Sequence, residues 1–218
     1  FLTQDVLAQM NDPPAATFLL EPKGRNTSPA IALAALQCAR QFSEDTLMLV
    51  LAADQLIPDV EAFVASASEA FRLAEQGKLV LFGINPTSPD TGFGYVEVDH
   101  VTREPQPVCR FVEKPDLRTA QGFLASGRYY WNSGMFAFTA RAIIAALERH
   151  APDVMRAARA CLSSTEIKDA HVHFDAHVFG LQPDISIDYA VMERADNVYV
   201  VPAKFAWSDV GSWPSVAK

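Results

Sequence analysis

The central part of the chain places polar residues of opposite character at the ends of two apolar stretches. Glu113 and Lys114 follow an apolar run over residues 108–112 and precede Pro115, and Asn132 lies where a second apolar run begins. Charged residues are rarely buried, so a strand that ends in Glu-Lys-Pro is poorly explained by packing alone. We expect two buried strands to bring Glu113, Lys114 and Asn132 to one rim, as the floor of a binding site.

Each of these residues also has a simpler structural interpretation. Lys114 could hold a phosphate or be a solvated lysine, and Glu113 could accept hydrogen bonds from sugar hydroxyls or pair with an arginine. The turn around Gly94 could let the backbone approach a ligand or be only a glycine-rich hairpin. The residues by themselves leave these alternatives open.

Asp54 and Asp209 are candidate metal ligands. Asp54 follows a strand predicted for residues 46–53, and ligands of open α/β sheets bind beyond the carboxyl ends of the strands. Mg²⁺ binds through one or two carboxylates together with substrate phosphates. Asp209 lies in a turn after another predicted strand, so the two carboxylates could share one ion. Each could equally cap a helix or a turn.

Glu21 could read a guanine base. The Watson–Crick edge of guanine presents two adjacent donors, N1–H and N2–H₂, and one carboxylate can accept both. Uracil and adenine do not offer that pair. The alternative is a salt bridge within the loop, with Lys23 or Arg25.

His171, His173 and His177 have mixed spacings and no carboxylate-rich surroundings. This pattern favours an exposed polar segment over a zinc site.

The elements that must position these residues follow an α/β pattern. Apolar strands are predicted for residues 17–20, 46–53 and 78–84, and helices between them for residues 29–42 and 58–76. Ser28 is expected to cap the first of these helices. The continuous apolar run at 46–53 predicts a parallel strand covered on both faces. Short alternating runs at 95–98 and 108–112 predict a smaller mixed or antiparallel region. Further helices are expected at 140–150, 152–162 and 187–194, and a strand at 197–201.

Composition and charge exclude several classes of function. The 218 residues are 50% hydrophobic and carry a net charge of −8, without the basic stripe that a nucleic-acid partner would require. No apolar run is long enough to span a bilayer and we find no signal-peptide pattern, so we expect a cytoplasmic protein with no membrane partner. Cys38, Cys109 and Cys161 are odd in number and widely spaced, which predicts buried free thiols.

Seven motifs, taken in order, resemble the mannose-1-phosphate guanylyltransferases, in particular the bacterial type that is often fused to a phosphomannose isomerase domain. The resemblance covers nearly the whole chain. The matching motifs are Glu21-Pro22-Lys23-Gly24-Arg25-Asn26-Thr27-Ser28-Pro29-Ala30, Leu51-Ala52-Ala53-Asp54, Gly92-Phe93-Gly94-Tyr95, Phe111-Val112-Glu113-Lys114-Pro115, Trp131-Asn132-Ser133-Gly134-Met135-Phe136, Ser186-Ile187-Asp188-Tyr189-Ala190-Val191-Met192-Glu193 and Trp207-Ser208-Asp209-Val210-Gly211-Ser212-Trp213.

This resemblance implies an α/β, Rossmann-like sugar-nucleotide transferase fold. Its mixed, mostly parallel sheet would be flanked by helices and joined to a smaller antiparallel sugar-binding region. The implied reaction converts GTP and mannose 1-phosphate to GDP-mannose and pyrophosphate, with Mg²⁺ as cofactor. By match of motif, Asp54 and Asp209 would hold Mg²⁺ and Lys114 would hold the sugar phosphate. Gly94, Glu113 and Asn132 would contact the mannose. The guanine would be read by the loop that contains Glu21, Pro22, Gly24, Arg25 and Asn26. Asp188 would join the substrate site in a role that the resemblance does not specify.

The chain also departs from the family pattern. Gln55 replaces the usual His after the metal-binding Asp, Ala206 replaces a common Gly, and Ser28 replaces a usual Ala. The family's first strand and its glycine-rich phosphate loop have no counterpart. We therefore expect residues 1–218 to be a single nucleotidyltransferase domain that lacks this front part and catalyses little by itself.

Two rival functions remain open at this point. One is a nucleotidyltransferase for another sugar 1-phosphate, and the other is a non-catalytic regulatory subunit that binds a sugar nucleotide. The sequence allows a homo-oligomer without specifying it.

Overall fold

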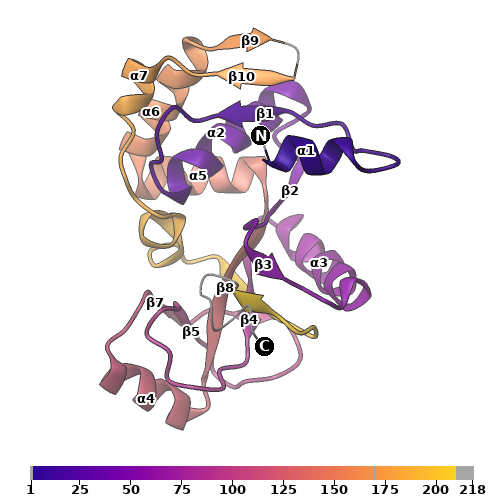
Figure 1. Ribbon diagram of the computed structural model, residues 1–218. Coiled ribbons are helices and arrows are strands. Elements are labelled where there is room, and N and C mark those ends of the chain that lie inside the picture. Colours follow the sequence, from indigo (N-terminus) through magenta and orange to yellow (C-terminus); the bar gives the residue numbers. More distant parts are fainter. Residues whose placement is uncertain (1, 169, 210–218) are drawn as a thin grey trace.

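The computed structural model describes residues 2–168 and 170–209. A seven-stranded sheet runs through the middle of the molecule, with helices on both of its faces (Figure 1). Its strands have the order β6-β11-β4-β8-β5-β7, and β2 pairs with β8 beside this path. The strands are β2 (Leu47–Val50), β4 (Leu79–Ile84), β5 (Tyr95–Glu97), β6 (Gln106–Pro107), β7 (Arg110–Val112), β8 (Tyr129–Thr139) and β11 (Val198–Pro202).

Two smaller sheets and the helices complete the fold. The first small sheet contains β1 (Phe18–Leu20), β10 (His171–His173) and β9 (Glu166–Lys168), and the second contains β3 (Gln55–Leu56) and β12 (Ser208–Asp209). The helices are α1 (Leu2–Ala8), α2 (Thr27–Gln41), α3 (Val60–Ala74), α4 (Leu117–Ser126), α5 (Ala140–His150), α6 (Pro152–Ser163) and α7 (Ala176–Gly180), and η1 (Asp188–Met192) is a π-helix. No helix within the described ranges is long and apolar enough to cross a membrane.

Strand β8 organises the main sheet. It has 11 residues and pairs antiparallel with β4 on one edge and with both β2 and β5 on the other. Strands β2 and β4 therefore run in the same direction, and α3 connects them as the strand–helix–strand pattern predicts. Because β8 lies between them, β4–β11 is the one parallel pair of this sheet among the described strands. The mixed α/β class is confirmed, whereas the expectation of mostly parallel pairing is wrong.

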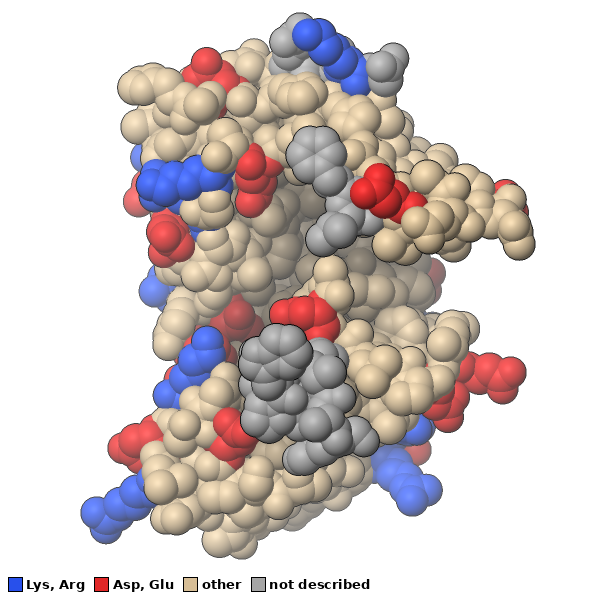
Figure 2. Space-filling view, in the orientation of Figure 1, with Lys and Arg blue, Asp and Glu red and all other residues tan. Residues whose placement is uncertain are grey.

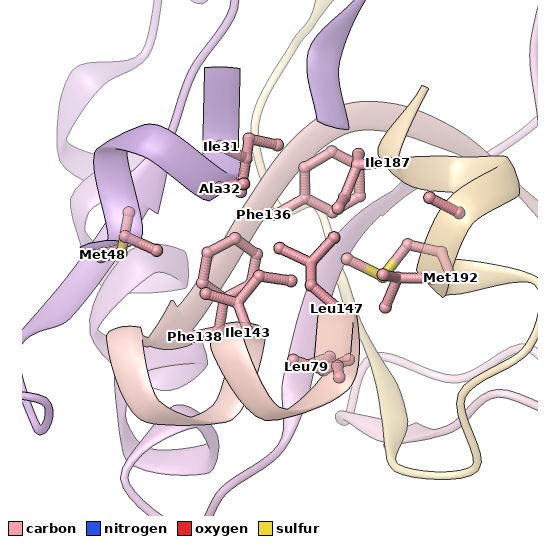
Figure 3. Packing of buried hydrophobic residues seen from close by; sticks show 14 of the residues in the cluster. Ile31, Ala32, Met48, Leu79, Phe136, Phe138, Ile143, Leu147, Ile187 and Met192 are labelled. Atoms are coloured by element: carbon pink, nitrogen blue, oxygen red, sulfur yellow. The ribbon is translucent and has the colours of Figure 1, made fainter. Parts of the chain in front are cut away.

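The core lies on both faces of the sheet. Leu79 and Leu81 of β4 pack into one cluster with α2, α5, α6 and η1, and Val80 and Phe82 pack into a second cluster against α3. Successive side chains of a strand point to opposite faces, so a strand with helices on both faces is apolar throughout. Figure 3 shows the first cluster, in which Ile187, next to η1, lies near Phe136 and Leu147.

Several local predictions need correction. Helix α2 begins at Thr27 rather than after Ser28, because the side chain of Asn26 accepts the Thr27 N–H at 3.0 Å and forms the N-cap. Strand β2 ends at Val50 and is mostly half-buried, since it pairs only with β8 in the part of the chain that the structure describes. Of the three thiols only Cys161 is buried. Cys109 lies exposed just before β7, because an apolar neighbourhood in sequence does not fix the direction of a side chain.

Candidate functional site

Four of the predicted site residues meet where β5, β7, β8 and η1 converge. The Asn132 backbone N–H donates to the Gly94 carbonyl at 2.8 Å, and its side-chain Nδ2 donates to Asp188 Oδ1 at 2.9 Å. A Cβ atom placed on Gly94 would lie 2.5 Å from Glu113 Oε2. Gly94, Glu113, Asn132 and Asp188 thus form one cluster, called the acceptor cluster below.

Glu113 is the most unusual carboxylate of this cluster. Its side chain is 10% exposed, and its Oε2 is buried without a hydrogen-bond partner among the described residues. Burial, followed by the charge of Asp188, raises the pKa of Glu113, while the Lys114 ammonium at 3.5 Å opposes that rise. A buried acceptor without a donor is costly, and a hydroxyl group from a ligand would satisfy it.

Lys114 lies at the solvent side of the acceptor cluster. Its side chain is 61% exposed, and its backbone has a φ of 44°, in the left-handed region. Non-glycine residues with positive φ are uncommon and concentrate at functional sites. The ammonium is therefore beside the cluster and accessible to an anion.

Asp188 holds the side chain of Asn132 in one orientation. Burial raises the pKa of Asp188, and the hydrogen bond from Asn132 counteracts part of that rise. Asn132 Oδ1 accepts the Gly134 N–H at 3.2 Å, so both ends of the amide are engaged. The amide nitrogen of Asn132 carries two N–H groups, so one remains for a further acceptor besides Asp188.

Asp54 and Asp209 are brought together by the small sheet of β3 and β12. Asp209 stands opposite Gln55 in the antiparallel register, and Asp54 directly precedes Gln55. The Gln55 side chain donates to the Ser133 carbonyl at 2.5 Å, next to Asn132 on β8. The backbones of Asp54 and Asp209 therefore lie close together, and the hydrogen bond from Gln55 to Ser133 ties this segment to β8 next to Asn132. The last residues of this motif, Val210 to Trp213, lie outside the described residues.

The loop before α2 has a different environment. Glu21 lies at the edge of a surface pocket of about 350 Å³, together with Leu19, Leu20, Ala30 and Leu33. Partial burial raises the pKa of Glu21, and it forms no ion pair with Lys23 or Arg25 within the described structure.

The other residues of this loop do not share the position of Glu21. Arg25 donates to the Gly180 carbonyl and Asn26 caps α2, so these two side chains bind the protein itself. Pro22 and Gly24 are exposed on the loop.

The histidine segment contributes to the small sheet at the top of Figure 1. His171 lies on β10 and stacks on Phe18 of β1, with a ring-centroid distance of 5.2 Å. No group of three or more metal-ligating side chains occurs among the residues that the structure describes.

Two contributors were missed by the sequence reasoning. The Glu113 N–H donates to Glu193 Oε1 at 3.2 Å, and the Ile187 N–H donates to Thr27 Oγ1 at 2.9 Å. The acceptors, Glu193 and Thr27, lie in the motifs at residues 186–193 and 21–30, but no local sequence pattern indicates which distant backbone N–H each of them binds.

Figure 2 shows that this face of the molecule is hollowed across its middle, between the part with β1 and β10 and the part with β5, β7 and α4. Acidic side chains border the hollow.

Comparison with known proteins identifies the family to which this chain belongs. A family model described as nucleotidyl transferase matches residues 2–218. Mannose-1-phosphate guanylyltransferase of Escherichia coli (strain K12) is 46% identical over 222 residues, which cover 99% of this chain and 46% of that protein. Xanthan biosynthesis protein XanB of Xanthomonas campestris pv. campestris (strain B100) is 48% identical over 216 residues, which cover 99% of this chain and 46% of that protein. The chain thus spans slightly less than half the length of these curated relatives.

Solved structures agree with the fold. A structure described as mannose-6-phosphate isomerase from Helicobacter pylori superposes with a TM-score of 0.88 at 33% identity, covering 96% of this chain and 80% of that one. A structure described as mannose-1-phosphate geranyltransferase from Thermus thermophilus gives a TM-score of 0.77 at 34% identity, covering 89% of this chain and 55% of that one. From the family match over residues 2–218 and these similarities, the chain belongs to the nucleotidyl transferase family.

Proposed function

We propose that residues 1–218 form the nucleotidyl-transfer domain of a cytoplasmic mannose-1-phosphate guanylyltransferase, which makes GDP-mannose and pyrophosphate from GTP and mannose 1-phosphate. The observation that carries this proposal is the acceptor cluster. It combines a buried oxygen that needs a donor, an oriented amide and an accessible ammonium. A sugar phosphate offers the matching hydroxyls and phosphate. The names of the E. coli relative and of XanB support GDP-mannose synthesis for polysaccharide formation.

On the acceptor side, Glu113 Oε2 accepts a hydrogen bond from a mannose hydroxyl and the free N–H of Asn132 donates to a sugar oxygen. Gly94 leaves the space in which Glu113 sits. Lys114 binds the phosphate as a mobile point charge. These roles use Glu113 Oε2, which has no partner among the described residues, the second N–H of Asn132 and the exposed Lys114 ammonium.

On the donor side, Glu21 accepts hydrogen bonds from guanine N1–H and N2–H₂ at the pocket of about 350 Å³. Leu19 and Leu33 provide apolar walls for a planar base. Pro22 and Gly24 shape the loop, whereas Arg25 and Asn26 hold it to α7 and α2.

The carboxylates of Asp54 and Asp209 fit a magnesium ion, because Mg²⁺ prefers oxygen ligands and takes only one or two of them from the protein when phosphates supply others. When bound, Mg²⁺ supplies positive charge that neutralises the phosphate oxygens. Gln55 anchors this pair beside Asn132 through its hydrogen bond to Ser133.

The reaction is an in-line displacement. A phosphate oxygen of mannose 1-phosphate forms a bond to the α-phosphorus of GTP, and the bond from that phosphorus to the bridging oxygen breaks, so pyrophosphate leaves. The attacking oxygen is already anionic, so no general base is needed. The protein's contribution is to hold two anions in line and to offset their repulsion with Lys114.

A pyrophosphate-release assay on the full-length gene product tests this function. GTP, ATP and UTP are crossed with mannose 1-phosphate and glucose 1-phosphate. We expect the combination of GTP and mannose 1-phosphate to have the highest kcat/KM. Preference for another pair would favour the rival sugar nucleotidyltransferase, and GDP-mannose binding without pyrophosphate release would favour the regulatory subunit. Sedimentation of the same sample measures whether the protein is a homo-oligomer.

A further inference from the structure

Two side chains outside η1 accept backbone N–H groups at its N-terminus. One is local, since Ser186 Oγ accepts the Tyr189 N–H at 3.3 Å. Ile187 precedes the π-helix, and no side chain of η1 itself accepts a hydrogen bond there. The first backbone N–H groups of a helix need acceptors from elsewhere. The Ile187 N–H finds one in Thr27 Oγ1 at 2.9 Å, on a helix that is remote in sequence.

A second hydrogen bond fixes the same junction. The Ser28 N–H donates to the Ile185 carbonyl at 3.1 Å, so the first turn of α2 and the segment before η1 are joined in both directions. The Ile187 side chain is fully buried in the core cluster of Figure 3, so apolar packing fixes this segment as well. The position of Asp188, the next residue, is therefore fixed by the buried Ile187 side chain and by the hydrogen bond from the Ile187 N–H to Thr27.

Helix α2 also borders the pocket of Glu21, because Ala30 and Leu33 line that pocket. The same helix thus contacts the proposed base site with one face and supports Asp188 with its first residue. Asp188 in turn orients the Asn132 amide through the 2.9 Å hydrogen bond. A continuous set of contacts runs from the base pocket to the acceptor cluster.

We propose that Thr27 is a positioning residue: its hydroxyl holds the Ile187 amide and so sets the place of Asp188 and the orientation of the Asn132 amide in the acceptor cluster. This proposal rests on the proposed function for its effect on the reaction, but its structural part stands independently. Thr27 touches no substrate in this scheme. Its hydroxyl acts through Ile187, Asp188 and Asn132 in that order.

The test compares Thr27→Val, which keeps the shape but removes the acceptor, with Thr27→Ser, which keeps the acceptor. In the full-length protein we expect Thr27→Val to raise the KM for mannose 1-phosphate about tenfold, with KM for GTP nearly unchanged, and Thr27→Ser to restore the wild-type value. Thr139→Val is the matched control. Its hydroxyl also accepts a backbone N–H at a helix start, from Ala142 at 3.1 Å, but it lies at the far end of β8.

A readout without catalysis separates this proposal from the proposed function. NMR of protein carrying isotope-labelled asparagine records the side-chain amide of Asn132 in the absence of substrates. We expect its signals to shift in Thr27→Val and to remain in place in Thr27→Ser and Thr139→Val. Unshifted signals in Thr27→Val, or an equal KM change in the Val and Ser variants, would overturn the proposal. A wild-type protein that releases no pyrophosphate would refute the proposed function while the amide signals still decide the role of Thr27.

Discussion

Gly94 lies directly against Glu113: a Cβ atom on Gly94 would be 2.5 Å from Glu113 Oε2 and 3.0 Å from Phe111 Cζ. Real Cβ contacts are not this short, so Gly94→Ala must displace the carboxylate. We expect the KM for mannose 1-phosphate to rise at least about tenfold, and overpacking to cost about 1–3 kcal/mol of unfolding free energy. Steady-state kinetics and urea unfolding measure the two effects.

Gly122→Ala serves as the control for that change. Gly122 lies in α4, and a Cβ atom there meets nothing within 4 Å. Alanine is the better helix former, so this variant should be slightly more stable with unchanged kinetics. Equal KM values in the two alanine variants would contradict the close packing of Gly94 and Glu113.

Glu113→Gln should stabilise the protein at neutral pH. Burial and the nearby Asp188 charge raise the pKa of Glu113 in the folded state, so the native protein holds this proton to higher pH than the unfolded chain does. The protonated Glu113 side chain therefore contributes to folding stability below the unfolded pKa of about 4.3, and this contribution is lost as pH rises through the folded pKa. The glutamine variant avoids that loss. Its melting temperature should exceed that of the wild type at pH 7 and approach it near pH 4, even as turnover falls.

Thermal melts between pH 4 and pH 8 test this pattern. Glu148→Gln is the comparison, since Glu148 forms an exposed pair with Arg159 and such pairs contribute little to stability. If the melting temperatures of the wild type and Glu113→Gln differed by the same amount at every pH, the ionised Glu113 would not be destabilising.

Lys114→Gln should weaken sugar-phosphate binding more than it weakens folding. The Lys114 ammonium is 61% exposed, so its ion pair with the buried Glu113 contributes only about 1 kcal/mol or less to stability, whereas the proposed role of this ammonium is to bind the phosphate dianion. We expect KM for mannose 1-phosphate to rise about tenfold or more, with a smaller change for GTP. Lys204→Gln, which removes a lysine paired with Glu69 at 3.2 Å, should leave both KM values unchanged.

Asp54→Asn and Asp209→Asn should each lower kcat by about a hundredfold or more, with a small change in melting temperature. We expect the two carboxylates to act on one ion, because the register sets Asp209 opposite Gln55, which directly follows Asp54. The double variant should therefore lose little beyond either single variant, because residues that act as a unit are not additive. Additive losses would place the two carboxylates at separate sites. Asp45→Asn, at an exposed pair with Arg141, controls for surface charge.

Glu21→Gln should relax the choice of base. A carboxylate accepts from two guanine donors, while a glutamine side chain accepts from one and opposes the other with its own N–H groups. We expect the ratio of kcat/KM for GTP over ATP to fall about tenfold to a hundredfold. Lys23→Gln changes the charge of the same loop and should preserve the ratio. An unchanged ratio in Glu21→Gln would contradict the guanine assignment.

The sequence alone predicted most of the longer helices and the strands β1, β2, β4, β5, β7 and β11, and it showed which residue types could do chemistry. The apolar run over residues 78–84 predicts a strand, and β4 (Leu79–Ile84) lies there with side chains packed on both faces of the sheet. The motifs with Glu113, Lys114 and Asn132 were predicted to form a site from residue type and position, and the function of that site stays a prediction.

The tertiary structure decided which partners meet. Insertion of β8 between β2 and β4 is a long-range pairing, and no local pattern specifies it. The same holds for the pairing of Asp209 with Gln55 and for the hydrogen bond between Asn132 and Asp188, which join segments far apart in the chain. Arg25 and Asn26 carry the residue types of a binding loop, yet the fold uses their side chains to hold α7 and α2. The residue type limits which partners a side chain can bind. The tertiary structure determines which partners lie within its reach.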